Sequence, residues 1–178
     1  MNDLLKKRRS IRKFKQQPVA PDLIDKLARA ALMSPSSRKI NPWEFIIVTD
    51  PELISKLSAC KEHGSAFLKG APLGIVVIAD ETKSDVWVED TSIASVIIQL
   101  TAEDLGLGSC WIQVRKRMKD SSTTSEDYVR SVLGLPGNYK VASVIAIGYP
   151  AETRPPCDEN ELLYEKLHSN KFGNCMKL

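Results

Sequence analysis

Apolar residues along the chain follow helical spacing in some stretches and form short compact runs in others. Helical spacing predicts four helices: from Pro21 until Ser34-Pro35 stops it, from Pro51 through Leu57, over Thr91–Leu105, and over Ser125–Leu133. Compact apolar runs predict four strands: Trp43–Thr49, Leu73–Ala79, Ser109–Val114 and Val141–Gly148. The chain after Pro150 is polar and contains proline, which predicts a helical or irregular tail. Since strands alternate with helices, we expect one layered α/β or α+β domain.

The predicted helix over residues 91–105 is apolar around most of its circumference. Asp90 or Thr91 is its expected N-cap, and Gly106 follows its last turn. A helix of this kind is expected to be buried on nearly all sides. One face of a small sheet cannot cover so much apolar surface, so we expect a second surface to pack against it.

Composition excludes several classes of protein. The 178 residues are 43% hydrophobic and 26% charged, which is typical of a globular domain and not of a disordered or collagen-like chain. The run Leu73–Ala79, broken by Gly74, is far shorter than the roughly 18 apolar residues of a membrane span. No apolar segment follows Met1, so no secretory signal is visible. We therefore expect a soluble, cytoplasmic protein without a membrane partner.

Cysteine and histidine are spaced too widely for a metal site. The four cysteines are far apart, and His63 and His168 are isolated. Zinc sites need clustered ligands, and disulfide frameworks occur mainly in small secreted chains, so we expect reduced thiols and no metal. The signatures of a phosphate-binding loop and of a nucleophile elbow are absent, and the Gly106–Gly108 pair ends a helix where a dinucleotide fingerprint would begin one.

One short segment accounts for the positive charge of the chain. The net charge is +3, yet residues 6–15 hold seven basic side chains and no acid, leaving 18 basic against 22 acidic residues elsewhere. A nucleic-acid surface would distribute its charge differently, so a local anion site is the better interpretation.

The residues within this segment suit a phosphate. If the segment is extended, Arg8, Ser10 and Arg12 project to one side; if it is helical, Arg9 and Arg12 share a face. Guanidinium groups match phosphate oxygens bidentately, and a hydroxyl adds a donor. A solvated basic terminus or a weak localisation signal is the alternative.

Two further segments carry candidate chemistry. Residues 34–43 form a loop of hydroxyls, cations and an amide that leads into a strand, which suits a polar heteroaromatic ligand but also fits an ordinary helix stop. Residues 105–113 combine glycines with an apolar strand that could lie against a flat ring, or else Trp111 and Ile112 pack in the core. Cys110 has no neighbouring histidine and is interpreted as a small buried apolar residue.

Taken together, the order and spacing of these motifs resemble the FMN-dependent nitroreductase family in a short-chain form. The resemblance extends over nearly the whole chain and rests on six motifs: Arg-Arg-Ser-x-Arg-x-Phe at 8–14, Pro-Ser-Ser-Arg at 35–38 with Asn-Pro-Trp-Glu-Phe at 41–45, Ala-Pro-x-x-Ile-Val-Val at 71–77, Glu-Asp-Thr-Ser-Ile-Ala at 89–94, Leu-Gly-Leu-Gly-Ser-Cys-Trp-Ile at 105–112, and Ile-Gly-Tyr-Pro at 147–150.

The resemblance implies a fold and an assembly. It implies an α+β nitroreductase-like fold, with a central, mostly antiparallel sheet flanked by helices and an intertwined homodimer. Residues 1–178 would form a single domain, with residues 150–178 as a C-terminal tail wrapping the partner subunit. The two FMN sites would lie at the dimer interface.

The resemblance also implies the residues that bind FMN. The phosphate and ribityl chain would be held by Arg8, Arg9, Ser10 and Arg12, with Arg154 as a late phosphate-binding cation. The partner subunit would contribute Pro35, Ser36, Ser37 and Asn41, while Trp111, Ile112 and Gln113 would lie along the flavin ring. No catalytic side chain and no metal ligand is implied.

Two residues depart from the common family pattern. Lys39 and Asn41 stand where many members have Asn and Gln. Lys39 would add positive charge near the flavin or its entrance, or else point into solvent. Asn41 is one methylene shorter than Gln, which changes its contact with the ring edge.

The implied activity is transfer of two electrons from NAD(P)H through FMN to a nitroaromatic, quinone or similar small-molecule acceptor, in ping-pong order. Two alternatives stay open at this point. One is an FMN-binding protein of the same fold without turnover of its own. The other is a flavin-dependent dehydrogenase or dehalogenase.

Overall fold

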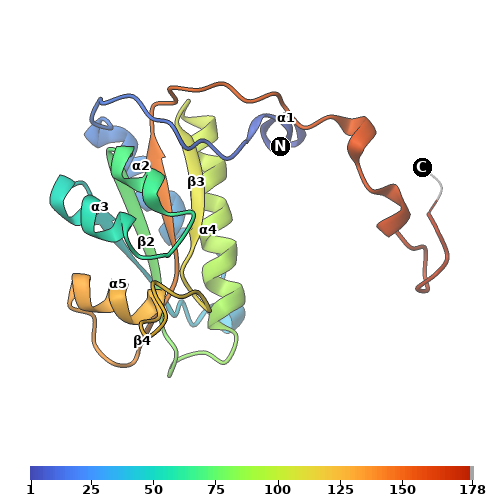
Figure 1. Cartoon of the computed structure of the whole chain (residues 1–178). Coiled ribbons are helices and arrows are strands. Elements are labelled where there is room, and N and C mark those ends of the chain that lie inside the picture. The colour runs from blue at the N-terminus through green and yellow to red at the C-terminus, as the bar shows by residue number, and fades with distance from the viewer. Residues whose placement is uncertain (177–178) are drawn as a thin grey trace.

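A four-stranded sheet forms the centre of the computed structural model, which describes residues 1–176 (Figure 1). Its order is β1 (Trp43–Val48), β2 (Leu73–Asp80), β4 (Tyr139–Gly148) and β3 (Gly108–Gln113). All neighbouring strands are antiparallel. The two central strands are the most buried, since every residue of β2 and all of β4 after Lys140 are buried. The expected α+β fold with an antiparallel sheet is confirmed, and β1 and β3 form its edges.

Helices cover both faces of this sheet. They are α1 (Asn2–Lys7), α2 (Pro21–Leu32), α3 (Pro51–Ser58), α4 (Trp87–Asp104) and α5 (Ser125–Leu133), with short 3-10 turns at Ser37–Lys39, Ala66–Gly70, Glu159–Glu161 and Tyr164–Lys166. Side chains of α2 and α4 share one apolar layer with the sheet, and those of α3 and α5 share the other. The chain therefore folds as three layers.

Helix α4 differs from the sequence-based expectation in two ways. It begins at Trp87, one turn before the predicted start, so neither Asp90 nor Thr91 is its N-cap. Asp90 lies inside the helix, and its carboxylate accepts a hydrogen bond from Ser37 N at 2.8 Å. The helix is also not buried all round in this chain, because Ile93 and Val96 are 43% and 45% exposed.

From Arg8 onward the N-terminal basic segment is non-helical, and it is joined to two other parts of the chain. Ile11 N donates to Ser109 O at 3.0 Å, and Lys15 N donates to Tyr149 O at 2.8 Å. The side chains of Ile11 and Phe14 are buried in the core. These contacts place the intervening polar residues at the start of β3.

The C-terminal tail leaves the body of the domain after β4 (Figure 1). It is attached near its start by a hydrogen bond from Cys157 N to Lys6 O at 2.9 Å and by the Lys6–Glu159 ion pair at 2.6 Å. Beyond these contacts several large apolar side chains are exposed: Leu162, Leu163, Tyr164, Leu167, Phe172 and Met176. Within residues 1–176, none of the helices combines the length and apolar character that crossing a membrane requires.

Candidate functional site

The basic segment and the chain beyond β4 together form a strongly cationic hollow. Its volume is about 320 Å³, and its lining consists of Arg8, Arg9, Ser10, Arg12 and Arg154. We call it the anion hollow. Arg154 is far from the other four in sequence, so the structure brings together the two groups of residues that were predicted to hold a phosphate. Arg8, Ser10 and Arg12 lie in a non-helical stretch, which excludes the helical one of the two geometries that the sequence left open, and Arg9 lines the same hollow.

Glu152 connects the two halves of the anion hollow. Its Oε1 accepts hydrogen bonds from Arg12 N at 2.6 Å and Lys13 N at 3.1 Å, while Oε2 pairs with Arg154 Nη2 at 3.2 Å. The hydrogen bond from Arg12 N, reinforced by the charge of Arg154, lowers the pKa of this carboxyl below its ordinary value. Glu152 is therefore a charged positioning residue beside the hollow.

The role of Glu152 was missed in the sequence. A usable signal was present, because an acid two residues before a suspected phosphate-binding cation is well placed to orient it. A second hollow of about 220 Å³ adjoins this carboxylate and is also lined by Arg9, Arg154 and the Gly106–Gly108 turn. The anion hollow thus lies at the C-terminal end of α4 and the start of β3.

Beyond the hollow, β3 presents polar groups along a free edge of the sheet. The Trp111 indole N–H donates to Gln113 Oε1 at 2.9 Å, and Gln113 Nε2 donates to Arg115 O at 2.9 Å. Val114 N donates to Ala142 O, so even-numbered residues of this strand direct their backbone groups toward β4. The alternation of an antiparallel ladder then turns the backbone N–H groups of Trp111 and Gln113 outward.

Ile112 has a different environment from its two neighbours. Its side chain is 1% exposed and belongs to the core layer beneath α3 and α5. Of the two interpretations that the sequence left open for Ile112, the structure favours core packing.

Cys110 lies directly behind the anion hollow. It is buried, and this burial raises the pKa of its thiol despite the lowering influence of Arg12 and Ser10. The interpretation of Cys110 as a small buried apolar residue is confirmed, because a neutral thiol out of contact with solvent is a poor nucleophile. All four cysteines are free, and residues 1–176 contain no cluster of three potential metal-ligating side chains.

The loop at residues 35–41 is a hydrogen-bonded turn beside the first turns of α4. Asn41 N donates to Ser36 Oγ at 2.9 Å, and Ser36 Oγ donates to Asn41 Oδ1 at 2.7 Å. The Arg38 side chain pairs with Asp85. Arg38, Lys39 and Asn41 all have φ values between 51° and 55°, a conformation that costs energy for residues with a Cβ.

This loop does not reach the anion hollow of its own chain. Ser37 is bonded to the N-terminal part of α4, whereas the hollow lies at the C-terminal end of the same helix. An 18-residue helix is roughly 27 Å long, so the two lie far apart. Pro35 and Lys39 are exposed at this position, and Lys39 has no ion pair in the part of the chain that the structure describes.

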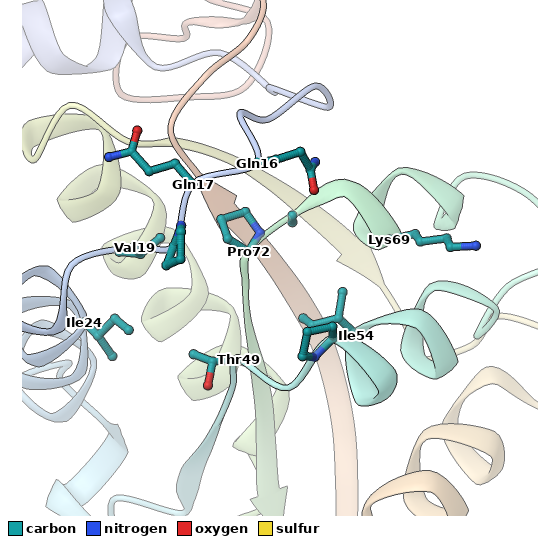
Figure 2. Close-up of a pocket in the computed structure, with 11 residues that line it drawn as sticks. Gln16, Gln17, Val19, Ile24, Thr49, Ile54, Lys69 and Pro72 are labelled. Carbon is teal, nitrogen blue, oxygen red and sulfur yellow. The ribbon is translucent and has the colours of Figure 1, made fainter.

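A hollow larger than the anion hollow lies elsewhere and has a different character. Figure 2 shows this space of about 440 Å³, bordered by Gln16, Val19, Thr49, Ile54 and Lys69 among others. Its lining is mostly apolar with a single cation. A phosphate dianion is better matched by the four guanidinium groups of the anion hollow than by one lysine, and we therefore assign the candidate site to the anion hollow and the free edge of β3.

Three comparisons with known proteins each match this chain to nitroreductases. The family model described as "Nitroreductase family" matches residues 5–61 and 58–149. A Methanothermobacter thermautotrophicus protein with the provisional name NADH dehydrogenase/NAD(P)H nitroreductase is 37% identical over 170 residues, which cover 92% of this chain and 86% of that protein. Among solved structures, an FMN-dependent nitroreductase from Clostridium difficile R20291 has a TM-score of 0.95 at 50% identity, covering 97% of this chain and all of that one.

Proposed function

The chain belongs to the nitroreductase family, and we propose that it is an FMN-dependent enzyme passing two electrons from NAD(P)H to a nitroaromatic, quinone or similar acceptor. The observation that carries the proposal is the anion hollow, where four guanidinium groups and a hydroxyl lie at the start of a free sheet edge. Family membership supports the oxidoreductase class, and the acceptor class is part of the proposal.

The residues of the site fit FMN. Arg8, Arg12, Arg154 and the Ser10 hydroxyl form a donor set suited to a phosphate dianion. The outward N–H groups of Trp111 and Gln113 are suited to the polar edge of a flavin ring. When bound, FMN supplies hydride acceptance from NAD(P)H followed by transfer of two electrons to the acceptor, in ping-pong order.

The protein's own contribution is to bind and orient. The guanidinium groups of the hollow hold the anionic end, and Glu152 keeps Arg154 and the backbone at Arg12 in place. The outward backbone N–H groups of β3 would offer fixed dipoles that stabilise negative charge on a bound flavin. Protons come from water, and no side chain is assigned as acid or base.

We further propose that the active unit is a homodimer with composite sites. Exposed Ile93 and Val96 of α4 and the exposed apolar side chains of the tail would be covered by a second copy. The loop at residues 35–41 lies far from the anion hollow of its own chain. In the dimer, the loop of the partner subunit would reach the flavin instead. Residues 1–178 would act as one domain in the cytoplasm, where free thiols stay reduced.

The dimer proposal predicts the mass in solution. Sedimentation equilibrium of the FMN-loaded protein should give about 40 kDa, twice the chain mass of 19.8 kDa. A monomer that binds one FMN per chain would contradict the proposal of composite sites.

Two measurements test the activity. The purified protein should show the visible absorption of oxidised flavin, and it should oxidise NADH or NADPH when a quinone or nitroaromatic is supplied. Flavin absorption without any turnover of either nucleotide would favour a flavin-binding protein instead. Failure to bind added FMN would overturn the proposal as a whole.

A further inference from the structure

Strand β3 has a second group of cations at its far end. Residues 115–119 read Arg-Lys-Arg-Met-Lys and begin two residues after Gln113. We call them the basic turn. The anion hollow adjoins the start of β3 at Ser109, and a six-residue strand spans roughly 17 Å. Two separate cationic groups therefore flank the strand that is proposed to bind the flavin.

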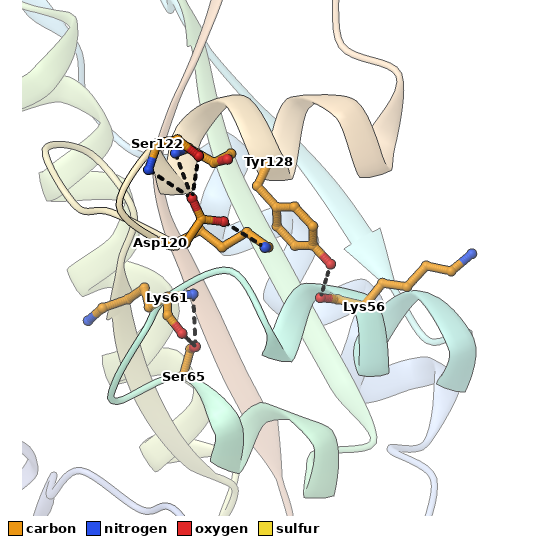
Figure 3. A network of polar contacts seen from close by, with 8 residues as sticks. Lys56, Lys61, Ser65, Asp120, Ser122 and Tyr128 are labelled. Atoms are coloured by element: carbon orange, nitrogen blue, oxygen red, sulfur yellow. Dashed lines mark hydrogen bonds and ion pairs between the residues drawn. The ribbon is translucent and has the colours of Figure 1, made fainter.

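The backbone of the basic turn is held in place by several contacts. Arg117 N donates to Val114 O at 3.1 Å, and Ser125 N donates to Arg117 O at 2.9 Å. Figure 3 shows the Asp120 carboxylate that follows, which accepts from Ser122 N at 3.0 Å and pairs with Lys119 Nζ at 3.0 Å. These hydrogen bonds hold the backbone of the basic turn in one conformation.

Three of the four cations in the turn are available to a ligand. In the region spanning residues 1–176, Arg115, Lys116 and Arg117 have no carboxylate partner, in contrast to Lys119. Lys116 and Arg117 are exposed, and the Arg115 guanidinium lies 5.6 Å from the ring centre of Trp87. Outside residues 6–15 acidic residues outnumber basic ones, so an unpaired run of three cations is unusual for this surface.

The turn is also connected to the strand that would line the flavin. Gln113, whose backbone N–H faces the free edge, donates through Nε2 to Arg115 O at 2.9 Å. A co-substrate reacting beside Gln113 therefore has these cations next to it. The anion hollow at the other end cannot serve this co-substrate, because it would be occupied by the phosphate of FMN.

We propose that Arg115, Lys116 and Arg117 bind the phosphate groups of the nicotinamide co-substrate and give NADPH preference over NADH. The inference rests on the proposed function. NADPH carries a 2′-phosphate that NADH lacks, and guanidinium groups bind phosphate oxygens bidentately. The stacked guanidinium and indole of Arg115 and Trp87 form one side of this site.

The test compares two triple variants of the FMN-loaded enzyme with equal loss of charge. One is Arg115→Gln/Lys116→Gln/Arg117→Gln. The control, Lys26→Gln/Arg29→Gln/Lys56→Gln, removes three exposed cations from α2 and α3. With menadione as a neutral acceptor, the first variant should lose at least about tenfold in kcat/KM for NADPH and much less for NADH, while the control keeps the parent's ratio.

A binding measurement gives an independent readout. Calorimetry of the FMN-loaded parent should show tighter binding of adenosine 2′,5′-bisphosphate than of 5′-AMP, and the basic-turn variant should lose the difference. An unchanged NADPH/NADH ratio in this variant overturns the inference. The inference also fails if the variant changes only the kcat/KM for the anionic acceptor 4-nitrobenzoate relative to neutral nitrobenzene. That result would mean that the basic turn binds the acceptor. A parent whose flavin neither nucleotide reduces refutes the proposed function itself.

Discussion

Replacing Arg12 with alanine is expected to weaken FMN binding by about 10- to 150-fold. Loss of one hydrogen bond between charged groups costs roughly 1.5–3 kcal/mol, and 1.4 kcal/mol corresponds to a factor of ten in Kd. Arg12 lines the anion hollow, and its guanidinium also lies 5.8 Å from the ring centre of Phe67, which limits where it can point. Arg8→Ala should have an effect of similar size. Fluorescence titration of the FMN-free protein with FMN measures both.

Arg29→Ala is the matched control for these variants. It removes a guanidinium from α2, where the side chain is exposed and paired with Asp25. FMN affinity should stay within error of the parent in this variant. If Arg8→Ala and Arg12→Ala also bind FMN as the parent does, the anion hollow is not the phosphate site.

Gly148→Ala is expected to destabilise the fold by about 1–3 kcal/mol, the range typical of overpacked cores. A Cβ at this position would lie 2.5 Å from Cδ and 2.8 Å from Cγ of Pro72, and 3.1 Å from Phe14 Cδ1. The proline ring cannot rotate away, so the backbone must shift. Because Phe14 anchors the basic segment in the core, the same shift should disturb the anion hollow.

Gly70→Ala provides the comparison for this effect. An added Cβ at Gly70 meets no atom within 4 Å, so the free energy of unfolding of the Gly70→Ala variant should stay close to that of the parent. Urea unfolding of all three proteins, in the FMN-free form and at saturating FMN, separates loss of stability from loss of binding. Equal stability of the two variants would show that close packing at Gly148 is unimportant.

The elements of secondary structure were largely predictable, and the exceptions have clear causes. Helix α5 begins and ends where the pattern placed it, because Thr124 caps its start and Gly134 adopts a left-handed conformation at its end. Helix α1 was not predicted, because its six residues are mostly polar or charged and are too few to show apolar residues at helical spacing. The capping signal at Asp90 misplaced the start of α4, since this carboxylate is bonded to Ser37 and the helix begins at Trp87.

The residue types in the sequence indicated an anion site, but the sequence did not show which distant residues complete that site. The acid-free run of cations at residues 6–15 was visible in the sequence and indicated an anion site without any structure. The closure of that site by Arg154 and Glu152 depends on hydrogen bonds between segments about 140 residues apart, which no local pattern encodes.

The sequence by itself determined the layered fold, the position of the basic segment and, through six ordered motifs, the family. These depend on local periodicity and on residue chemistry, which can be recognised along the chain. Only the tertiary structure decided that Ile112 belongs to the core, that residues 35–41 lie a helix length away from the hollow of their own chain, and that the basic turn lies at the opposite end of β3. The direction of a side chain and the distance between segments depend on how strands and helices pack, and packing joins residues that are remote in sequence.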